Sequence, residues 1–391
     1  MTASPRLNVA RLAVLPDFPE EHWPSMDLCA DRLVSHLLAS HGERLDVSRV
    51  CPPYRRCAAL LPLVGRGGAA RNVDRLYNRQ WVYPRFAARQ AKRFELFHVV
   101  DHSYAQVVHA LPAARTGVFC HDLDTFRCLL APQVEPRPRW FRAMARRALT
   151  GLQKAADVFH ATLDVRRQIE ALNLIDPGRL VHAPLGIDPV FSATAPEPHV
   201  ADGCIGEFAR GQPFVLNVGS CIERKRIDVL LDTFAELRRH HAHLKLIQVG
   251  GEWTAPQVGQ IERLHLSDHV RQVRGIAPVA LASLYHRAAV VVQPTEAEGF
   301  GLPLAEALAC GAGVVTSDLP VLREVGGDAC VYAPVGDPHA LARRVDRYLT
   351  RHDAPPRDVR LKQGALYAWD THARIIADAY VRLAEGTLHT S

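Results

Sequence analysis

Lysine is scarce in this chain: five of its 47 basic residues are lysine, and the other 42 are arginine. The sequence also lacks a run of about 18 apolar residues, so no transmembrane helix is predicted. Nine cysteines are scattered without a CxxC pair, which indicates neither a zinc site nor a disulfide framework but reduced, mostly buried thiols. The first residues show no basic segment followed by an apolar one, so we expect a cytoplasmic protein.

Length and composition predict two globular domains. The chain has 391 residues, of which 48% are hydrophobic and 23% are charged, enough for two separate cores. Charge is uneven. Residues 1–190 carry 26 basic against 18 acidic residues (+8) and residues 191–391 carry 21 against 23 (−2), which together give the net charge of +6.

Short apolar, β-branched runs alternate with longer helical patterns along the chain, which is typical of parallel βαβ units. The polar stretch 192–213, broken by proline and glycine, predicts a linker between two doubly wound halves. The expected strands are residues 8–15, 96–101, 116–120, 158–162 and 179–184 before this stretch, and 214–219, 244–250, 269–275, 290–294 and 313–317 after it.

The segment EAEGFGLPLAEALACG, residues 296–311, predicts a short helix after a buried strand, with Pro303 in its first turn and Gly311 at its C-terminal cap. The backbone amides near its start face the carboxyl end of the sheet, where anions bind to helix N-termini. The acids Glu298 and Glu306 flank the turn. Alternatively, these acids only complement the helix dipole, an effect of about 0.3 to 1 kcal/mol each.

Two further strand ends point to the same edge of the sheet. A strand ends at Gly219, and a helix is expected to begin near Arg226, with Arg224 and Lys225 beside it. Cations oppose the dipole at a helix N-terminus, so the cluster favours a bound anion; the alternative is a solvated basic turn. In the third loop, the adjacent glycines 250 and 251 leave room for a ligand to approach.

These motifs resemble glycosyltransferase family 4. The similarity rests on VGS…ERKRIDVLL, VGGEW and PTEAEGFGLPLAEALACGAGVVTSDLPVLREVGGDA, and extends to HDLDTF, APLGIDPVF and LYAWDTHARIIADAYVRL. The resemblance implies the α/β GT-B fold, in which two Rossmann-like domains face each other across a cleft. We expect an acceptor-side domain at 1–190, a nucleotide-sugar domain at 191–370, and a last helix at 371–391 that packs back on the first domain.

The resemblance also implies roles for single residues. Glu306 would bind the ribose hydroxyls, Glu298 would lie near the transferred sugar, and His121 would line the cleft. The expected catalytic residues are His121, Glu298, Arg224 and Lys225, of which the two cations hold the diphosphate. The acceptor side would include His102 and Asp122. The expected donor-binding residues are Gly219, Ser220, Arg224, Lys225, Gly250, Gly251, Glu298, Phe300, Gly301, Leu302 and Glu306.

The implied reaction is the transfer of a sugar from a UDP- or GDP-sugar to a lipid-linked or saccharide acceptor, with retained anomeric configuration, in cell-envelope glycan or glycolipid synthesis. No metal or other cofactor is expected. An epimerase or phosphorylase of the same fold, or a non-catalytic basic binding module, stays open. The chain departs from many members of the family in two places: Ser220 stands where they have arginine, and PDFPEEHWPSM replaces a glycine-rich loop.

Three patterns support other classes of protein weakly. Asp122 and Asp124 form a DxD spacing, which in a metal-dependent transferase holds a divalent cation. VGRGGA, with Gly65 and Gly67, fits a dinucleotide fingerprint but has no acid about 20 residues further on. The basic composition lacks any recognisable nucleic-acid motif, so no nucleic-acid partner is expected.

Aromatic and arginine side chains are interleaved in residues 66–94 and 137–147. Such a mixture suits the headgroup region of an anionic membrane, which would place the enzyme at the inner face of the membrane and favour a lipid acceptor. Alternatively, the aromatics belong to the core of an ordinary helical domain and the arginines are solvated.

Overall fold

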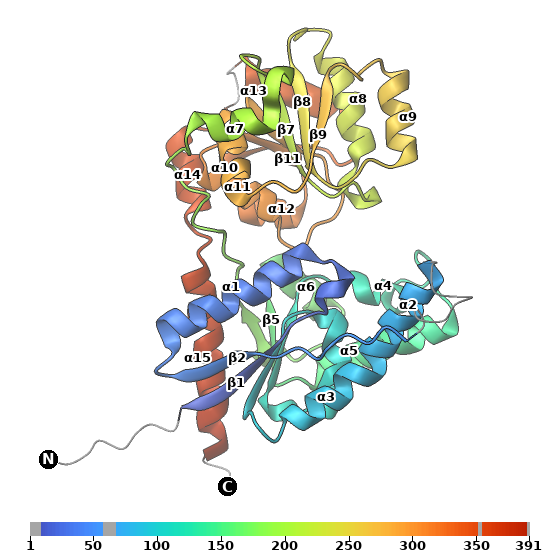
Figure 1. The fold of residues 1–391 in the computed structure, drawn as a ribbon, viewed down its shortest axis with the longest axis vertical. Coiled ribbons are helices and arrows are strands. Elements are labelled where there is room, and N and C mark those ends of the chain that lie inside the picture. The colour runs from blue at the N-terminus through green and yellow to red at the C-terminus, as the bar shows by residue number, and fades with distance from the viewer. Residues whose placement is uncertain (1–8, 58–67, 351–353, 389–391) are drawn as a thin grey trace, which may run out of the picture. The chain divides into compact units, whose positions relative to one another are not determined.

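The computed structural model describes residues 9–57, 68–350 and 354–388, and the chain forms two compact units (Figure 1). The first comprises residues 1–186 and 369–391, and the second comprises residues 187–368. The chain therefore passes between units twice, a few residues before the boundaries expected at 190 and 370.

The first unit is built on a six-stranded parallel sheet with the order β2-β1-β3-β4-β5-β6. Its four central strands are buried along nearly their whole length, because helices cover both faces of an all-parallel sheet. The strands are β1 (Ala10–Leu15), β2 (Leu45–Arg49), β3 (Leu96–Val99), β4 (Thr116–Cys120), β5 (Asp157–His160) and β6 (Leu180–His182).

Helices connect these strands and supply the other half of the core, in which Phe97, Val118 and Leu152 are buried. The α-helices are α1 (Pro24–His41), α2 (Gly68–Tyr77), α3 (Tyr83–Gln90), α4 (Arg127–Leu130), α5 (Arg139–Lys154) and α6 (Leu163–Ala171). The π-helix η2 (Asn78–Val82) joins α2 to α3. The 3₁₀ helices are η1 (Pro19–Glu21), η3 (His102–Ala110), η4 (Ala113–Arg115), η5 (Asp124–Phe126) and η6 (Pro177–Arg179).

The last helix, α15 (Trp369–Leu388), belongs to the first unit and packs against α1 (Figure 1). The hydroxyl of Tyr380 donates a 2.8 Å hydrogen bond to the carbonyl oxygen of Phe97. Gly117 of β4 makes room for it, since a Cβ there would lie 2.5 Å from the Tyr380 hydroxyl. The return of the C-terminal helix to the N-terminal domain is confirmed.

The second unit has a six-stranded parallel sheet with the order β12-β11-β10-β7-β8-β9. Two strands were not predicted, β2 in the first unit and β12 here, and both lie at a sheet edge. The strands are β7 (Phe214–Gly219), β8 (Lys245–Gly250), β9 (Val270–Val273), β10 (Val290–Gln293), β11 (Val314–Ser317) and β12 (Cys330–Ala333).

The expected linker at 192–213 is wrong. These residues lie inside the second unit and form α7 (Pro198–Ile205), which buries Ala201 and Ile205 and packs against α10. The other helices of this unit are α8 (Ile227–Leu237), α9 (Ala255–Arg263), α10 (Pro278–Arg287), α11 (Leu302–Ala309), α12 (Pro320–Gly326), α13 (Pro338–Leu349) and α14 (Arg357–Gly364), with the 3₁₀ helices η7 (Gly206–Phe208), η8 (Glu223–Lys225) and η9 (Gly327–Ala329).

The strand orders define where each sheet binds ligands. In the first unit the chain runs outward from β1 to β2 and then resumes on the other side of β1 with β3. In the second unit the same reversal separates β7 from β10. Open α/β sheets bind ligands at the carboxyl ends of the strands beside such a reversal. The loops after β1 and β3, and after β7 and β10, are therefore the candidate ligand-binding loops.

Two expectations about composition can be compared with the structure. All nine cysteines have free thiols, and six of them are buried, as predicted. Within the described residues, no helix combines the length and the apolar character that crossing a bilayer requires.

Candidate active site

The loops after β7 and β10 are joined at the reversal point of the second sheet. The carbonyl oxygen of Arg224 accepts hydrogen bonds from the backbone N–H of Glu296 (2.9 Å) and the hydroxyl of Thr295 (3.0 Å). The Arg224 guanidinium in turn donates to the carbonyl oxygen of Ala297 (2.8 Å). These hydrogen bonds hold together two loops that are about seventy residues apart in the sequence.

Glu298 is the centre of this structure. Its Oε1 is bonded to the Lys225 ammonium, and its Oε2 lies 3.5 Å from Arg224 Nη1. The side chain of Glu298 is only 8% exposed and that of Lys225 is 13% exposed, so these two charges are largely removed from water, whereas the side chain of Arg224 is 35% exposed. The structure brings together three of the residues predicted to be catalytic.

Arg226 lies beside this cluster but has other partners. It is in the left-handed conformation (φ 49°), and its guanidinium contacts Asp228 at 2.8 Å and Glu296 at 3.2 Å. The basic residues at the start of α8 are therefore balanced by carboxylates of the chain itself. Their charge alone therefore does not call for an external anion, and a bound anion at this turn stays a prediction.

Helix α11 begins as predicted. Gly301 has φ 93°, and a Cβ there would lie 2.8 Å from Leu322, so glycine is required. Among the described residues, no protein acceptor binds the backbone N–H groups of Phe300, Gly301 and Leu302. Phe300 is 5% exposed and packs edge-on against Tyr367, with ring centroids 5.2 Å apart.

The glycines after β7 and β8 serve the packing of the two loops. A Cβ on Gly250 would lie 2.3 Å from the carbonyl oxygen of Gly219, and one on Gly251 would lie 2.5 Å from the backbone nitrogen of Cys221. Packing against the neighbouring backbone therefore accounts for these two glycines, and their donor-binding role stays a prediction. Ser220, between the two strand ends, is exposed.

Glu306 lies on α11 and is held by a helix next to it. The hydroxyl of Tyr285, on α10, donates a 3.0 Å hydrogen bond to its Oε2. Glu306 is partly exposed as a residue, yet burial of its carboxyl group raises its pKa to about 8, against the lowering effect of the Tyr285 hydrogen bond.

In the first unit, His121 and His102 come together at the ends of β4 and β3. The backbone N–H of His121 donates to Nδ1 of His102 (3.3 Å), and His121 Nε2 lies 2.9 Å from the carbonyl oxygen of Val100. Asp122 Oδ1 lies 3.5 Å from His102 Nε2. Burial lowers the pKa of His121, an effect that the charge of Asp101 opposes.

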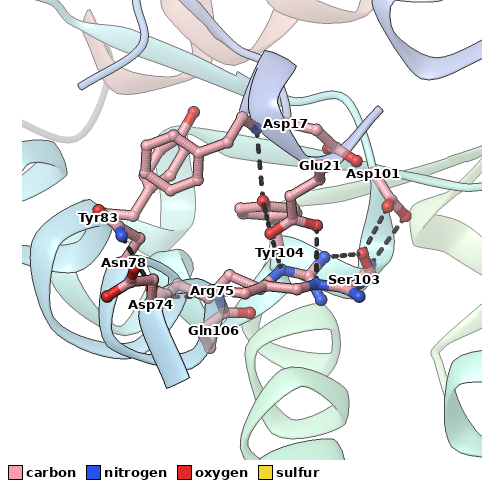
Figure 2. Close-up of polar contacts among 12 residues, drawn as sticks. Asp17, Glu21, Asp74, Arg75, Asn78, Tyr83, Asp101, Ser103, Tyr104 and Gln106 are labelled. Atoms are coloured by element: carbon pink, nitrogen blue, oxygen red, sulfur yellow. Dashed lines mark hydrogen bonds and ion pairs between the residues drawn. The ribbon is translucent and has the colours of Figure 1, made fainter. Parts of the chain in front are cut away.

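Asp17 and Asp101, which were not predicted as site residues, face each other at the reversal point of this sheet (Figure 2). Asp17 is 2% exposed, and neither of its carboxyl oxygens has a hydrogen-bond partner among the described residues. Burial raises the pKa of Asp17 well above its usual range, and the charge of Asp101 raises it further. Asp17 follows the expected strand 8–15 and Asp101 ends the expected strand 96–101, and these positions at strand ends were the available signal.

Asp101 is held as a carboxylate. It accepts hydrogen bonds from the backbone N–H (2.9 Å) and the hydroxyl (2.5 Å) of Ser103, and its Oδ1 lies 3.2 Å from His102 Nδ1. Burial alone would raise the pKa of Asp101, but the adjacent histidines and the Ser103 bonds outweigh it and lower the pKa to about 2.

The loop after β1, which replaces a glycine-rich loop, is fixed by Glu21 (Figure 2). This carboxylate, 1% exposed, lies 3.1 Å from Arg75 Nε and 3.2 Å from Arg79 Nε. It also accepts a 2.8 Å hydrogen bond from the hydroxyl of Tyr104. Sequence reasoning did not predict this cluster, because its members come from segments without a shared pattern.

The structure describes the DxD motif at Asp122 and Asp124 but not the glycine motif at Gly65 and Gly67. Asp122 accepts a 3.0 Å hydrogen bond from the backbone N–H of Asp124, so the DxD pair forms a turn. No group of three or more His, Cys, Asp or Glu side chains with metal-binding geometry occurs among residues 9–57, 68–350 and 354–388. Gly65 and Gly67 of the glycine motif lie outside the described residues.

Comparison with known proteins gives consistent matches. Residues 205–365 match the family model "Glycosyl transferases group 1". An O-antigen chain mannosyltransferase B from Escherichia coli is 27% identical over 66% of this chain and 68% of its own length. A D-inositol 3-phosphate glycosyltransferase from Kineococcus radiotolerans is 33% identical over 44% of this chain and 41% of its own length. The chain thus spans under half of the second relative.

Solved structures share the fold over nearly the whole chain. A sucrose-phosphate synthase from Thermosynechococcus elongatus aligns with a TM-score of 0.74 at 19% identity, covering 96% of this chain and all of its own. HepE from Anabaena, solved with UDP and glucose, aligns with a TM-score of 0.65 at 15% identity, covering 98% and 100%.

Two six-stranded parallel sheets of this order, together with these matches, define a glycosyltransferase of the GT-B fold. The match to the group 1 glycosyl transferases covers residues 205–365, within the second unit, and supports this class for the chain. Its placement in family 4 is consistent with these matches and stays a prediction.

Proposed function

We propose that this enzyme transfers a hexose from a UDP- or GDP-sugar to a saccharide or lipid-linked acceptor in cell-envelope glycan synthesis, with retained anomeric configuration. The observation that carries the proposal is the cluster of Glu298, Lys225 and Arg224 at the reversal point of the second sheet. The name of the Escherichia coli relative, which refers to an O-antigen chain, and the UDP in the HepE structure support the same substrate classes.

The chemistry assigns these residues electrostatic roles. When a nucleoside diphosphate leaves an anomeric carbon, negative charge grows on its phosphate oxygen. Preorganised cations and N–H groups stabilise that charge best where water is excluded. Lys225 and Arg224 supply the cations, and the N–H groups at the start of α11 supply donors without a protein partner. Displacing Glu298 from the cations leaves its carboxylate available to position the sugar.

The acceptor is assigned to the first unit. His121, His102 and Asp122 lie together at the carboxyl edge of its sheet, where ligands of open α/β sheets bind. Hydroxyl groups of a saccharide match this mixture of imidazole and carboxylate groups, which donate and accept hydrogen bonds.

A lipid-linked acceptor is favoured by the surface of α5 and its surroundings. Trp140 on α5 is 57% exposed, and Trp81 on η2 is 52% exposed, whereas Tyr83 is buried in the core. The aromatic residues of the two basic stretches therefore divide between core and surface. Arg146 and Arg147 line an open hollow of about 670 Å³ beside His109. Exposed indole rings and arginines together suit an anionic membrane surface.

Ligand-induced stabilisation followed by a transfer assay tests the proposal. UDP-, GDP- and ADP-sugars are compared for the rise in Tm that each gives, because stabilisation grows with ligand concentration relative to Kd. We expect a UDP- or GDP-sugar to stabilise the protein. The product formed with a saccharide acceptor is expected to keep the donor's anomeric configuration by NMR.

The same assay separates the alternatives. An epimerase converts the donor without any acceptor, and a phosphorylase requires inorganic phosphate, so turnover of either kind would contradict a transferase. Absence of stabilisation by every nucleotide sugar, with salt-sensitive retention on nucleic acid, would favour a binding module.

A further inference from the structure

Tyr285 forms a buried hydrogen bond with the carboxyl group of Glu306. The tyrosine is 0% exposed, and its hydroxyl lies 3.0 Å from Glu306 Oε2. Its ring packs edge-on against Phe191, with centroids 5.8 Å apart. Because ring packing fixes the phenol, the hydroxyl is directed at one particular oxygen of Glu306.

The Tyr285 hydroxyl is the hydrogen-bond donor to Glu306 among the groups that surround this carboxyl group. The charge of Asp188 disfavours a second negative charge on Glu306. Cys310, about one turn further on, is the C-terminal cap of α11. Other charged or titratable side chains on the helices that pack against α11 have partners elsewhere. These pairs include His286 with Ser192, Arg287 with Asp202, Arg323 with Asp318, Arg357 with Ala193, Arg360 with Tyr348, and Lys362 with Asp358.

The protonation state of Glu306 decides how it binds a diol. A carboxylate accepts hydrogen bonds from two hydroxyls, whereas a neutral carboxyl group is a weaker acceptor and carries a proton that competes for one of its oxygens. Burial raises the pKa of Glu306 to about 8, which works against the charged form at neutral pH. A hydrogen bond donated to the carboxylate favours the charged form.

We propose that Tyr285 is a positioning residue for the nucleotide: it holds Oε2 of Glu306 and favours the carboxylate, so that Oε1 is free to accept a ribose hydroxyl. The inference rests on the proposed function and on the ribose-binding role that the family resemblance implies for Glu306. Tyr285 acts through Glu306 and does not itself contact the ligand.

Replacing Tyr285 by phenylalanine keeps the ring and removes only the hydroxyl. Without that donor the charged form of Glu306 is less favoured, so Glu306 ionises at a higher pH in Tyr285→Phe. The variant should therefore reach full nucleotide affinity at a higher pH than the wild type does. We expect the midpoint of affinity against pH to rise by about one unit, a tenfold change in the proton equilibrium. Affinity at neutral pH falls accordingly and recovers in alkaline solution.

The experiment measures Kd for UDP and for GDP by calorimetry between about pH 6 and about pH 10, with the 2′-deoxy form of each nucleotide beside it. Tyr332→Phe is the matched control, because it removes another hydroxyl from the same unit, one bonded to the carbonyl oxygen of Gly327 at 2.8 Å. Its midpoint should equal that of the wild type. Glu306→Gln should abolish both the pH dependence and the preference for the 2′-hydroxyl form.

The possible failures are distinguishable. If neither UDP nor GDP binds the wild type, the proposed function is overturned and the role of Tyr285 with it. If Glu306→Gln binds both forms as the wild type does, the ribose-binding role of Glu306 is overturned, and the role of Tyr285 with it. If Glu306→Gln behaves as expected but Tyr285→Phe keeps the wild-type midpoint, or loses affinity equally at every pH, only the role of Tyr285 is overturned.

Discussion

Asp17 and Asp101 stand at equivalent positions of two neighbouring parallel strands. Leu15 of β1 pairs with Val99 of β3, and each aspartate follows its strand's last paired residue by two positions. Their carboxyl groups meet at the edge of the sheet (Figure 2), where one is protonated more readily than usual and the other less readily. A proton on Asp17 turns two facing acceptors into a hydrogen bond.

Asp17→Asn should stabilise the protein above about pH 4. The folded state retains a proton on Asp17 that the unfolded chain releases near its usual pKa, so the free energy of unfolding falls as the pH rises from there through the raised folded-state pKa. Asparagine has no such proton and can donate to Asp101. Urea unfolding at about pH 4 and about pH 8 measures the free energy of unfolding of the variant and of the wild type. We expect the advantage of the variant to be larger at the higher pH by at least about 1 kcal/mol.

Asp101→Asn should have the opposite effect and serves as its control. The folded-state pKa of Asp101 is lowered to about 2, so its charge stabilises the fold above the unfolded pKa and that contribution disappears as the pH falls toward 2. The variant should lose about 2 kcal/mol near pH 7 and little in strong acid. Equal effects of both variants across the pH range would contradict opposite protonation states.

Glu306→Ala should weaken nucleotide binding, whereas Glu298→Gln should mainly slow transfer. Loss of a charged hydrogen bond to the ribose costs about 1.5 to 3 kcal/mol, measurable as Kd for the nucleoside diphosphate. Glu298→Gln removes the charge that competes for Lys225, so its diphosphate affinity should not fall while kcat does. Equal nucleotide affinity in Glu306→Ala and the wild type would remove the ribose assignment.

Activity should persist in excess chelator and fall steeply in Arg224→Ala and Lys225→Ala. The two cations are proposed to stabilise the charge of the leaving diphosphate, and loss of one such group costs about 10²- to 10³-fold in kcat. Initial rates with and without chelator provide the measurement. Chelator-sensitive activity restored by Mn²⁺ would instead assign Asp122 and Asp124 to a metal.

Binding to anionic liposomes should depend on α5. Arg139, Arg146 and Trp140 are exposed, whereas Arg137 is paired with Glu135 at 2.9 Å. We therefore expect Arg139→Glu with Arg146→Glu to abolish low-salt sedimentation with the vesicles. Binding should also be released by high salt, because exposed charges are screened.

The matched control carries the same charge change on the second unit. Arg239 and Arg343 are exposed there, and replacing both by glutamate should leave sedimentation unchanged. Equal loss in both double variants would show a non-specific charge effect, and failure of the wild type to sediment at low salt would favour a soluble acceptor.

The ten expected strands all formed because buried parallel strands appear in sequence as continuous apolar runs. The edge strand β2 is harder to detect, since Asp46 and Arg49 interrupt its apolar residues. Helix α7 was not predicted for a similar reason: it buries Ala201 and Ile205, too few apolar residues to show a helical period in a segment that also contains Pro198 and Gly203.

The candidate site was predictable where residues lie in the loop that follows a predicted strand. Arg224, Lys225 and Glu298 satisfied that condition, and the reversal of strand order brings their loops together. Their pairing was not predictable, because opposite charges 73 positions apart carry no local pattern. Tyr285 lies inside a helix that packs on another helix, and only the tertiary fold shows which carboxyl group its hydroxyl reaches.

Because Glu298 is paired with Lys225 and Arg224, any anionic ligand must compete with its carboxylate for these cations. A small anion from solution meets cations that are already paired with the carboxylate of Glu298, and it must displace this tethered group, whose local concentration is high. A nucleotide sugar compensates for that displacement with its ribose, base and sugar contacts, which an isolated phosphate lacks. The enzyme should therefore work undisturbed in a cell rich in inorganic phosphate.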